Sequence, residues 1–260
     1  PKVMEGLLSE LLKYKRTFMG KLIVFFPLFF AVYALVLSIL MQNPLAEAHG
    51  NTAISYGTFL ASVFNWWSFL FLPLGYALFA ALAASQEKKA GNYQALLSRN
   101  VSPAVLWVSK ILGMAVYTLL SSCVLILVVS MTGLIGAEGV LPAGKILAGS
   151  LVCWLVSLPL IPLQLWAATR GGIFLSMGMG FAGMILGVVA APGTVWIICP
   201  WSWATRLMCP VIGVHPNGTM LSDSDPLLSC TAIPLGIVVS LAALAVFTLF
   251  TTVWFTKRER

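Results

Sequence analysis

The side chains that usually carry catalysis are few and widely separated in this sequence. The two histidines, His49 and His215, fall in different polar segments, and no HExxH pattern is present. A phosphate-binding loop needs the pattern GxxxxGK[ST], whose backbone amides and lysine hold the phosphates. Gly20-Lys21 and Gly144-Lys145 lack the upstream glycine and the following Ser or Thr. We therefore expect no catalytic site and no nucleotide site in this chain.

The five cysteines offer a second kind of chemistry. Cys123 and Cys153 lie in apolar stretches, where a cysteine packs as a small apolar residue. Cys199, Cys209 and Cys230 share a later segment that we assign below to the outer face, where an oxidising environment would allow a disulfide. These three can equally be unpaired small apolar residues. Because there is no Cys-x-x-Cys pair and no Cys/His cluster, we expect no metal site.

The composition shows which kind of element must hold these residues. Hydrophobic residues make up 60% of the 260, against 15 Lys and Arg and 8 Asp and Glu. A soluble domain has about 45–50% apolar residues, so a soluble fold is excluded, and the same apolar excess excludes disorder. The apolar runs are unbroken rather than alternating, which excludes a membrane β-barrel. The sequence therefore predicts an all-α integral membrane protein.

Six apolar runs are long enough to cross a hydrocarbon core of ~30 Å, which takes a helix of about 20 residues. They cover residues 22–41, 59–84, 111–135, 146–169, 172–198 and 232–256. Pro159 and Pro162 fall inside the fourth run and Pro192 near the end of the fifth, so we expect kinks or a break there. No run contains an ionisable residue, which argues against an ion-coupled carrier. We expect one transmembrane domain with a polar outer loop at residues 199–231.

The basic residues predict the orientation of this domain. With six spans both termini share one side, and that side receives 13 of the 15 Lys and Arg. Only Lys145 and Arg206 fall on the other side. Basic residues concentrate on the cytoplasmic side of membrane proteins, so we expect both termini in the cytoplasm. The net charge of +7 follows from this topology and gives no reason to expect a nucleic-acid partner.

Residues 3–18 predict an amphipathic helix that lies in the membrane interface before the first span, an elbow helix. Its apolar side holds Leu7, Leu8, Leu11, Tyr14, Lys15 and Phe18. Its opposite side holds Glu5, Glu10, Lys13 and Arg16. The basic side chains would reach toward lipid phosphates. The simpler alternative is a basic flank that anchors the first span.

The longest cytoplasmic loop, residues 86–103, combines charges, a turn signal and a short helix-like stretch. Its notable residues are Glu87, Lys88, Lys89, Ala90, Gly91, Asn92, Tyr93 and Leu97. Ser102 and Pro103 fit the cap and the first turn of the next helix. A short helix between two long spans would act as a lever that couples the chain to a separate motor subunit. A solvated charged loop is the alternative.

Several of these segments resemble the permeases of lantibiotic-immunity ABC transporters, of the MutE/EpiE type. The resemblance is specific over residues 11–111 and weaker beyond. It is carried by residues 12–18, 27–30, 64–67, 72–75, 87–93, 97–98, 100–101, 106–107 and 109–111, with a loose similarity at 200–203.

The resemblance implies the ABC-2 exporter fold, with six helices, cytoplasmic termini and an interfacial elbow helix that includes Leu8, Leu11, Lys13, Lys15 and Arg16. It implies that the loop after the second span docks on an ATPase subunit, which would hold the ATP and Mg²⁺ that this chain does not bind. The working complex would contain an ATPase homodimer and two permeases, often two different chains. The substrate would be a cationic, membrane-active lantibiotic peptide.

Aromatic residues give candidates for the substrate path. Asn65, Trp66 and Trp67 lie within the second span, and Trp201 and Trp203 lie beside Pro200 at the outer end of the fifth. Tryptophan rings bind amphiphiles and cations, but they also anchor helices at the membrane interface. Both interpretations remain open. The segment around Pro200 also resembles a hinge or a re-entrant segment.

Small residues recur at four-residue spacing in two rows along the fifth run. The first row is Gly172, Ser176 and Gly180, and the second is Gly183, Gly187 and Ala191. Such rows let helices approach closely, so we expect this run to pack tightly against a neighbour, within the chain or in the second permease.

The sequence as a whole favours the permease subunit of an ATP-driven exporter in a bacterial cell membrane, which expels a lantibiotic and gives immunity or resistance. One alternative is an ABC-2 exporter for another antibiotic, drug or lipid. The other is a membrane scaffold or sensor without a motor.

Overall fold

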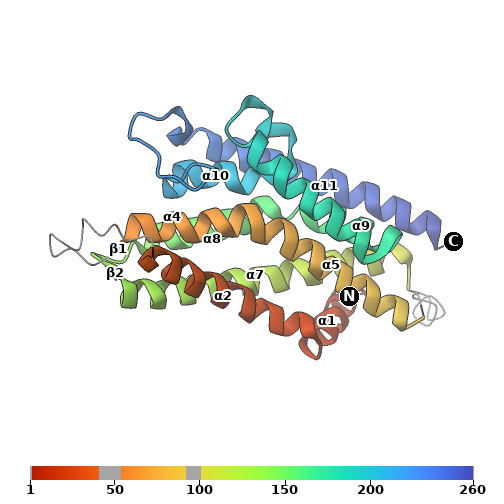
Figure 1. Cartoon of the computed structure of the whole chain (residues 1–260). Helices are drawn as coiled ribbons and strands as arrows, with labels where there is room; N and C mark the ends of the chain where they lie inside the picture. The colour runs from red at the N-terminus through yellow and green to blue at the C-terminus, as the bar shows by residue number, and fades with distance from the viewer. Residues whose placement is uncertain (1, 41–53, 92–100, 260) are drawn as a thin grey trace.

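The computed structural model shows an elongated bundle of helices and describes residues 2–40, 54–91 and 101–259 (Figure 1). In this part of the chain, five helices are long and apolar enough to cross a membrane. They are α2 (Phe18–Leu40), the continuous helix of α4 (Tyr56–Trp66), η1 (Trp67–Phe71) and α5 (Leu72–Lys89), α7 (Pro103–Gly136), α9 (Leu160–Ala190) and α11 (Ala232–Arg258). The predicted all-helical membrane class is confirmed.

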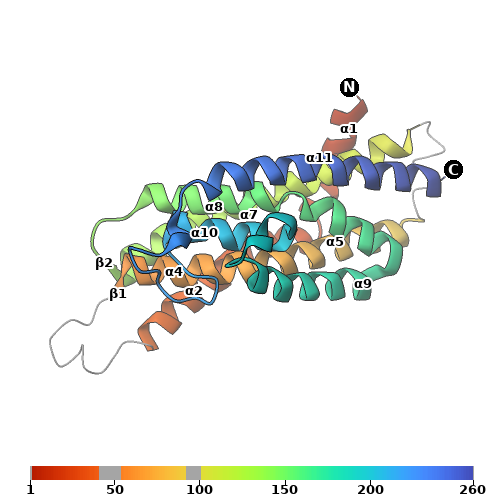
Figure 2. The same ribbon diagram turned by 90° about the horizontal axis from the view of Figure 1, so that it is seen from above.

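Shorter helices pack on these five, and α1 (Lys2–Lys15) and α8 (Ala143–Ser157) are the first two along the chain. The N-terminal α1 crosses the start of α7, and the apolar α8 has only 15 residues. The second span is the most buried of the five long helices and α11 is the least. The bundle is therefore built around α4 and α5, while α11 presents most of its surface to the surroundings (Figure 2).

Local signals set where the helices begin. The Ser102 hydroxyl accepts a hydrogen bond from the amide of Val105 at 3.3 Å, and Pro103 occupies the first turn of α7. A proline is tolerated there because its missing N–H would have no helical partner. The predicted cap of this helix is confirmed. Ser55 caps α4 in the same way, through the amide of Thr58 at 3.2 Å.

The second span contains one widened turn. Residues Trp67–Phe71 form a π-helix between α4 and α5, directly before Pro73. A proline inside a helix removes one N–H donor and clashes with the carbonyl four residues earlier. A π-turn relieves this conflict without breaking the helix, and such turns are frequent at functional sites.

The chain reverses direction inside α9. Gly172 has φ 69° and ψ −160°, which is not helical. The Ser176 hydroxyl lies 3.2 Å from Gln164 Oε1, although twelve residues of straight helix would separate them by about 18 Å. Residues 160–171 and 173–190 therefore run antiparallel, and the second piece lies beside α5 (Figure 2). The reversal falls at the first residue of the predicted fifth run.

Two predicted boundaries need correction. The fourth run, 146–169, is interrupted at Leu158–Pro159, where α8 ends and α9 begins. The fifth, 172–198, is too long, because α9 ends at Ala190 and a 3₁₀ turn, η2 (Thr194–Ile198), follows Pro192. The prolines at 159 and 192 account for both breaks, since each lacks the N–H that would continue a helix.

The segment after α9, which was predicted as a loop at residues 199–231, contains short helices. It contains η3 (Pro200–Ser202), α10 (Trp203–Ile212) and η4 (Pro226–Leu228). Most of α10 is buried against α4, α8 and α11, and Gly213 ends it with φ 90°. Arg206 is buried there too, because its guanidinium donates to the Leu227 carbonyl at 3.0 Å and lies over the Trp196 ring.

Two short β-strands pair at the α10 end of the bundle. Strand β1 (Ile54–Ser55), which precedes α4, pairs in parallel with β2 (Ala137–Glu138), which follows α7. The opposite end receives α1, the end of α5, the start of α7, the Gly172 reversal and the end of α11 (Figures 1 and 2).

Candidate functional site

Three elements bring four charged side chains together at the end of the bundle that holds α1. Glu10 and Lys13 come from α1, Glu87 from the end of α5, and Lys110 from near the start of α7. Lys110 Nζ lies 3.0 Å from Glu10 Oε2 and 2.8 Å from Glu87 Oε1. Lys13 Nζ lies 2.8 Å from Oε1 of each of the two glutamates. We call these four residues the charge junction.

The charge junction is largely withdrawn from solvent. The side chain of Lys110 is 1% exposed, those of Glu87 and Glu10 are 6% and 7%, and that of Lys13 is 30%. Burial of an ion costs several kcal/mol unless a partner compensates it. Two carboxylates and two ammonium groups sum to zero charge here, so each ion has a partner. The three helices are consequently linked by interactions that are costly to break.

The electrostatics keep Lys13 charged at neutral pH. Burial alone lowers the pKa of the Lys13 ammonium, and the like charge of Lys110 acts in the same direction. The Glu10 carboxylate and the hydrogen bonds to Glu10 and Glu87 outweigh both effects, so the pKa is raised above its ordinary value. The stabilisation from Lys13 is therefore complete at physiological pH and is lost only when the pH rises through this elevated pKa.

Small residues let α1 approach α7 closely enough to form the charge junction. A side chain on Gly113 would meet Glu10 Cβ at 3.1 Å, and one on Gly6 would collide with Ser109. The Tyr117 hydroxyl donates to the Leu11 carbonyl at 2.8 Å. Helix α1 is thus fastened along the first half of α7.

This packing corrects the predicted faces of the N-terminal helix. Glu10, assigned to the polar side, is buried against α7, whereas Leu8, assigned to the apolar side, is 55% exposed. Two lysine partners make burial of the carboxylate possible, which an apolar-periodicity argument does not consider. The helix also ends at Lys15 rather than at residue 18, because the Thr17 hydroxyl and amide both bond to the Tyr14 carbonyl.

The exposed basic residues of this segment lie outside the charge junction. Lys15 is exposed in the last turn of α1, and Arg16 follows the end of the helix and is also exposed. Leu11 is half-buried against the hydrophobic core.

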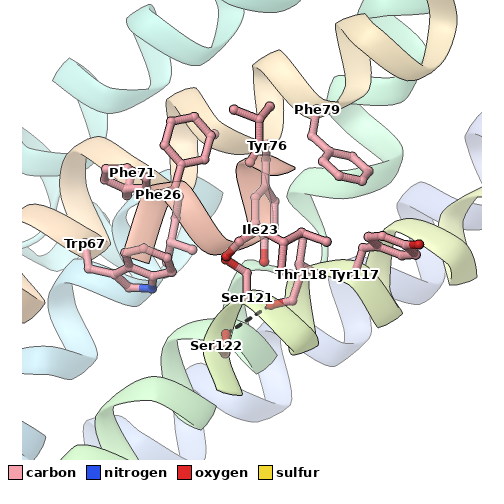
Figure 3. A pocket seen from close by; sticks show the side chains of 13 residues that line it. Ile23, Phe26, Trp67, Phe71, Tyr76, Phe79, Tyr117, Thr118, Ser121 and Ser122 are labelled. Carbon is pink, nitrogen blue, oxygen red and sulfur yellow. Dashed lines mark hydrogen bonds between the residues drawn. The ribbon is translucent and has the colours of Figure 1, made fainter. Parts of the chain in front are cut away.

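A small cavity lies between α2, α5 and α7, further along the bundle. One side of it is aromatic, with Phe26, Trp67, Phe71 and Phe79 (Figure 3). The other side carries hydroxyl groups, those of Tyr76, Thr118, Ser121 and Ser122. Its volume of about 40 Å³ has room for water but none for a peptide.

A larger apolar groove shares a wall with this cavity. Its volume is about 510 Å³, and Leu22, Phe26, Phe71 and Gly75 line both spaces. Phe25 and Phe29 of α2 edge the groove and are about 60% exposed, at 59% and 60%. Met177 contributes from the second piece of α9. The groove can receive the apolar part of an amphiphile.

A family model described as ABC-2 family transporter protein matches residues 7–189, more than half of the chain. The chain belongs to the ABC-2 family. Proteins of this family are the membrane subunits of transporters, generally lack an ATPase of their own and associate with an ABC ATPase. Searches of curated proteins and of solved structures found no match. The matched region contains residues 7–15 of α1, the end of α5 and the start of α7, and so the whole charge junction.

The predicted coupling residues of this ABC-2 permease divide into three groups. Glu87 is buried in the charge junction, so it is not part of a solvated loop. Lys88, Lys89, Ala90 and Gly91 are exposed where α5 ends, and Gly91 has φ 92°. Asn92, Tyr93 and Leu97 lie outside the described residues.

The candidates for the substrate path are mostly covered. Asn65 is buried, and its Nδ2 donates to the carbonyls of His215 and Pro216 at 3.3 and 3.2 Å. Trp67 is 3% exposed, stacks on Phe71 and borders the small cavity. Trp66 is half-buried beside Tyr33.

The two later tryptophans pack on the chain itself. Trp203 is buried and donates through Nε1 to the Ile197 carbonyl at 3.0 Å. Trp201 lies against α9, where side chains on Gly183 and Gly187 would collide with it. These rings hold the segment after α9 against the bundle.

The row of small residues in α9 has neighbours within the chain. A side chain on Gly180 would meet Ala77 Cβ at 2.6 Å and the Pro73 carbonyl at 3.0 Å. The Ser176 hydroxyl donates to the Ala77 carbonyl at 2.8 Å. Gly172 has no neighbour within 4 Å of a built Cβ, and its positive φ serves the reversal instead.

All five cysteines lie in the described residues, and all are unpaired there. Cys209 is buried in α10, Cys199 is half-buried and Cys230 is exposed. Cys199, Cys209 and Cys230 are thus separate thiols, in line with the second of the two interpretations above. No group of His, Cys, Asp and Glu able to hold a metal ion occurs among the described residues.

Sequence reasoning missed the charge junction, although a signal for it exists. Lys110 falls in helical register with Trp107, Met114 and Tyr117, all of which are buried. A lysine within such an apolar stripe must find an acidic partner. Asking whether Glu10 and Glu87 also lie within apolar stripes would have identified them as candidates for that partner.

Proposed function

We propose that this chain is the permease subunit of an ATP-driven exporter that expels a cationic lantibiotic from the cytoplasmic membrane of a bacterium. The charge junction carries the mechanical part of the proposal, because it joins the elbow helix, the start of the coupling loop and the third span. The resemblance over residues 11–111 supports the substrate class. The permease would have six passes and cytoplasmic termini, with α8 and residues 160–171 together forming the fourth pass.

The mechanism follows from the links at the charge junction. An ATPase dimer closing on ATP would grip residues 86–98 and displace the end of α5. Because Glu87 is ion-paired with Lys110 and Lys13, the displacement would move α7 and α1 together with α5. Two permeases moving in this way would switch the space between them from membrane-open to outside-open.

The apolar groove supports an amphiphilic substrate taken from the membrane. It lies on α2, α5 and the second piece of α9, and exposed phenylalanines edge it. A membrane-active peptide could place its apolar side chains there while its cationic groups stay in the headgroup region.

The proposal is tested by growth inhibition in a sensitive Gram-positive host. The host carries this chain with its partner ATPase and second permease, or the same set without it, and is exposed to lanthipeptides and to unrelated drugs. We expect protection against one or more lanthipeptides only, lost when this chain is omitted. Protection against unrelated drugs alone would assign another cargo. No protection by an assembled complex would contradict export altogether.

A further inference from the structure

A cleft of about 670 Å³ lies beside the charge junction, between the end of α5, the Gly172 reversal and the end of α11. Its basic residues are Lys88, Arg170 and Arg258, one from each of these three segments. Leu82, Ile173 and Phe174 form part of its apolar wall. The cleft is therefore amphipathic, with three cations around an apolar wall.

Tryptophan rings hold the two arginines of the cleft in place. The guanidinium carbon of Arg170 lies 5.5 Å from the centroid of the Trp166 ring, and that of Arg258 lies 5.5 Å from the Trp254 ring. The two rings contact each other edge to face at 6.2 Å. Arg258 also donates to the Thr169 carbonyl at 2.9 Å. These contacts favour one placement of each guanidinium group before any ligand arrives, which lowers the entropy cost of binding.

Most of the N–H donors in the cleft remain available. A guanidinium has five of them, and Arg258 uses one on Thr169, with Glu259 at 3.7 Å from its Nε. Within the described residues, the side chains of Arg170 and Lys88 form no hydrogen bond or ion pair. The remaining donors point to an acceptor that the chain does not itself supply.

The charge of the cleft is positive. Two acids border it, Glu87 and Glu259. The first is already neutralised by the lysines of the charge junction, so it does not offset the three cations. Glu259 offsets one of them. The cleft therefore favours an anion.

We propose that this cleft binds the phosphate of an anionic phospholipid of the inner leaflet. Arginine pairs hold phosphate through parallel N–H bonds, and basic pockets between transmembrane helices bind lipid headgroups in this way. The apolar wall accommodates the first part of an acyl chain, and Phe174, which is 89% exposed, extends it outward. Only the choice of leaflet rests on the proposed orientation.

A lipid in this position links the moving end of α5 to α11. It bridges Lys88, one residue beyond the charge junction, with Arg258 at the end of the last span. Binding of anionic lipid therefore stabilises the arrangement of helices seen here, by mass action.

The test is lipid titration of the purified full-length chain in detergent, followed by native mass spectrometry. The probes are phosphatidylglycerol, zwitterionic phosphatidylcholine and soluble glycerol phosphate. The test variant is Arg170→Gln/Arg258→Gln. The matched control, Lys2→Gln/Lys257→Gln, removes two exposed cations that do not line the cleft.

We expect wild type and control to bind phosphatidylglycerol in preference to phosphatidylcholine. The arginine variant should bind phosphatidylglycerol about thirty-fold more weakly, from ~1 kcal/mol for each basic group. An Arg170→Lys/Arg258→Lys variant keeps the charge and should recover part of the affinity, which excludes misfolding as the cause.

Two results would overturn the proposal. Equal phosphatidylglycerol binding by wild type and the arginine variant would place the lipid elsewhere. Binding of glycerol phosphate as tight as that of the lipid would assign the cleft to a soluble phosphate.

Discussion

Lys110 is the residue on which the end of the bundle that holds α1 most depends. It is the least exposed member of the charge junction and contacts both glutamates. Its removal would leave Glu10 and Glu87 buried with only the half-exposed Lys13 between them. A buried ion that loses its partner destabilises a protein by about 3–5 kcal/mol.

We therefore predict that Lys110→Met lowers the apparent Tm of the purified chain in detergent by about 10 °C. The matched control is Lys89→Met, because Lys89 is exposed at the end of α5 and should leave the Tm nearly unchanged. The double variant Glu87→Gln/Lys110→Met leaves the Glu10–Lys13 pair intact and should recover much of the loss. Equal Tm values for Lys110→Met and Lys89→Met would show that the charge junction contributes nothing to stability.

Individual residues show where sequence reasoning succeeds and where it stops. Ser102 and Pro103 were predictable because a cap depends on neighbours in the chain. The charge junction was not predicted, because its members are separated by up to 100 residues and meet only when α1 crosses α7. The side of a helix that faces a partner is decided by that partner, so Glu10 was assigned to the wrong face.

Among the helices, the apolar runs were predictable and their interruptions only partly so. The prolines at 159 and 192 indicated breaks, and the reversal at Gly172 falls at the first residue of the predicted fifth run. The π-turn before Pro73 has no separate sequence signal, because a proline in a helix can also produce a simple kink. Helix α10 was missed because Arg206 and Pro210 gave its short apolar stretch the composition of a loop.

The contact between α9 and the segment after it supports a prediction on packing. A side chain on Gly187 would lie 2.6 Å from the Trp201 carbonyl oxygen, which is backbone and cannot rotate away. We predict that Gly187→Leu displaces η3 and α10 and costs about 1–3 kcal/mol or more. Thermal unfolding in detergent and native gels of the complex measure the effect.

Gly178→Leu is the control for this substitution. It lies in the same helix, and a Cβ built on it has no neighbour within 4 Å. Its Tm should stay close to that of wild type. If Gly187→Leu were as stable as Gly178→Leu, Trp201 would not be seated against α9 as described.

The whole molecule has two unlike ends. One end collects the charge junction and the basic cleft, and the other holds α10 and the paired strands β1 and β2. Because basic residues stay on the cytoplasmic side, we predict that the end with α10 faces outward. This prediction rests on charge distribution, which can be read from the sequence alone.

Labelling of single cysteines tests this orientation. A variant that keeps only Cys230, which is exposed at the α10 end, should react with an impermeant maleimide on intact cells. A variant with Lys257→Cys as its only cysteine should react only after permeabilisation. The reverse pattern would invert the topology and with it the side on which an ATPase can bind.

We propose that a separate ATPase drives this ABC-2 permease through the loop that follows Glu87. The decisive experiment is affinity purification of the tagged chain, expressed with its partner ATPase and second permease. We predict that wild type retains the ATPase and that Lys89→Glu/Tyr93→Ala, which spares the charge junction, loses it while keeping the wild-type Tm. Recovery of the folded wild-type chain without any ATPase would contradict the claim.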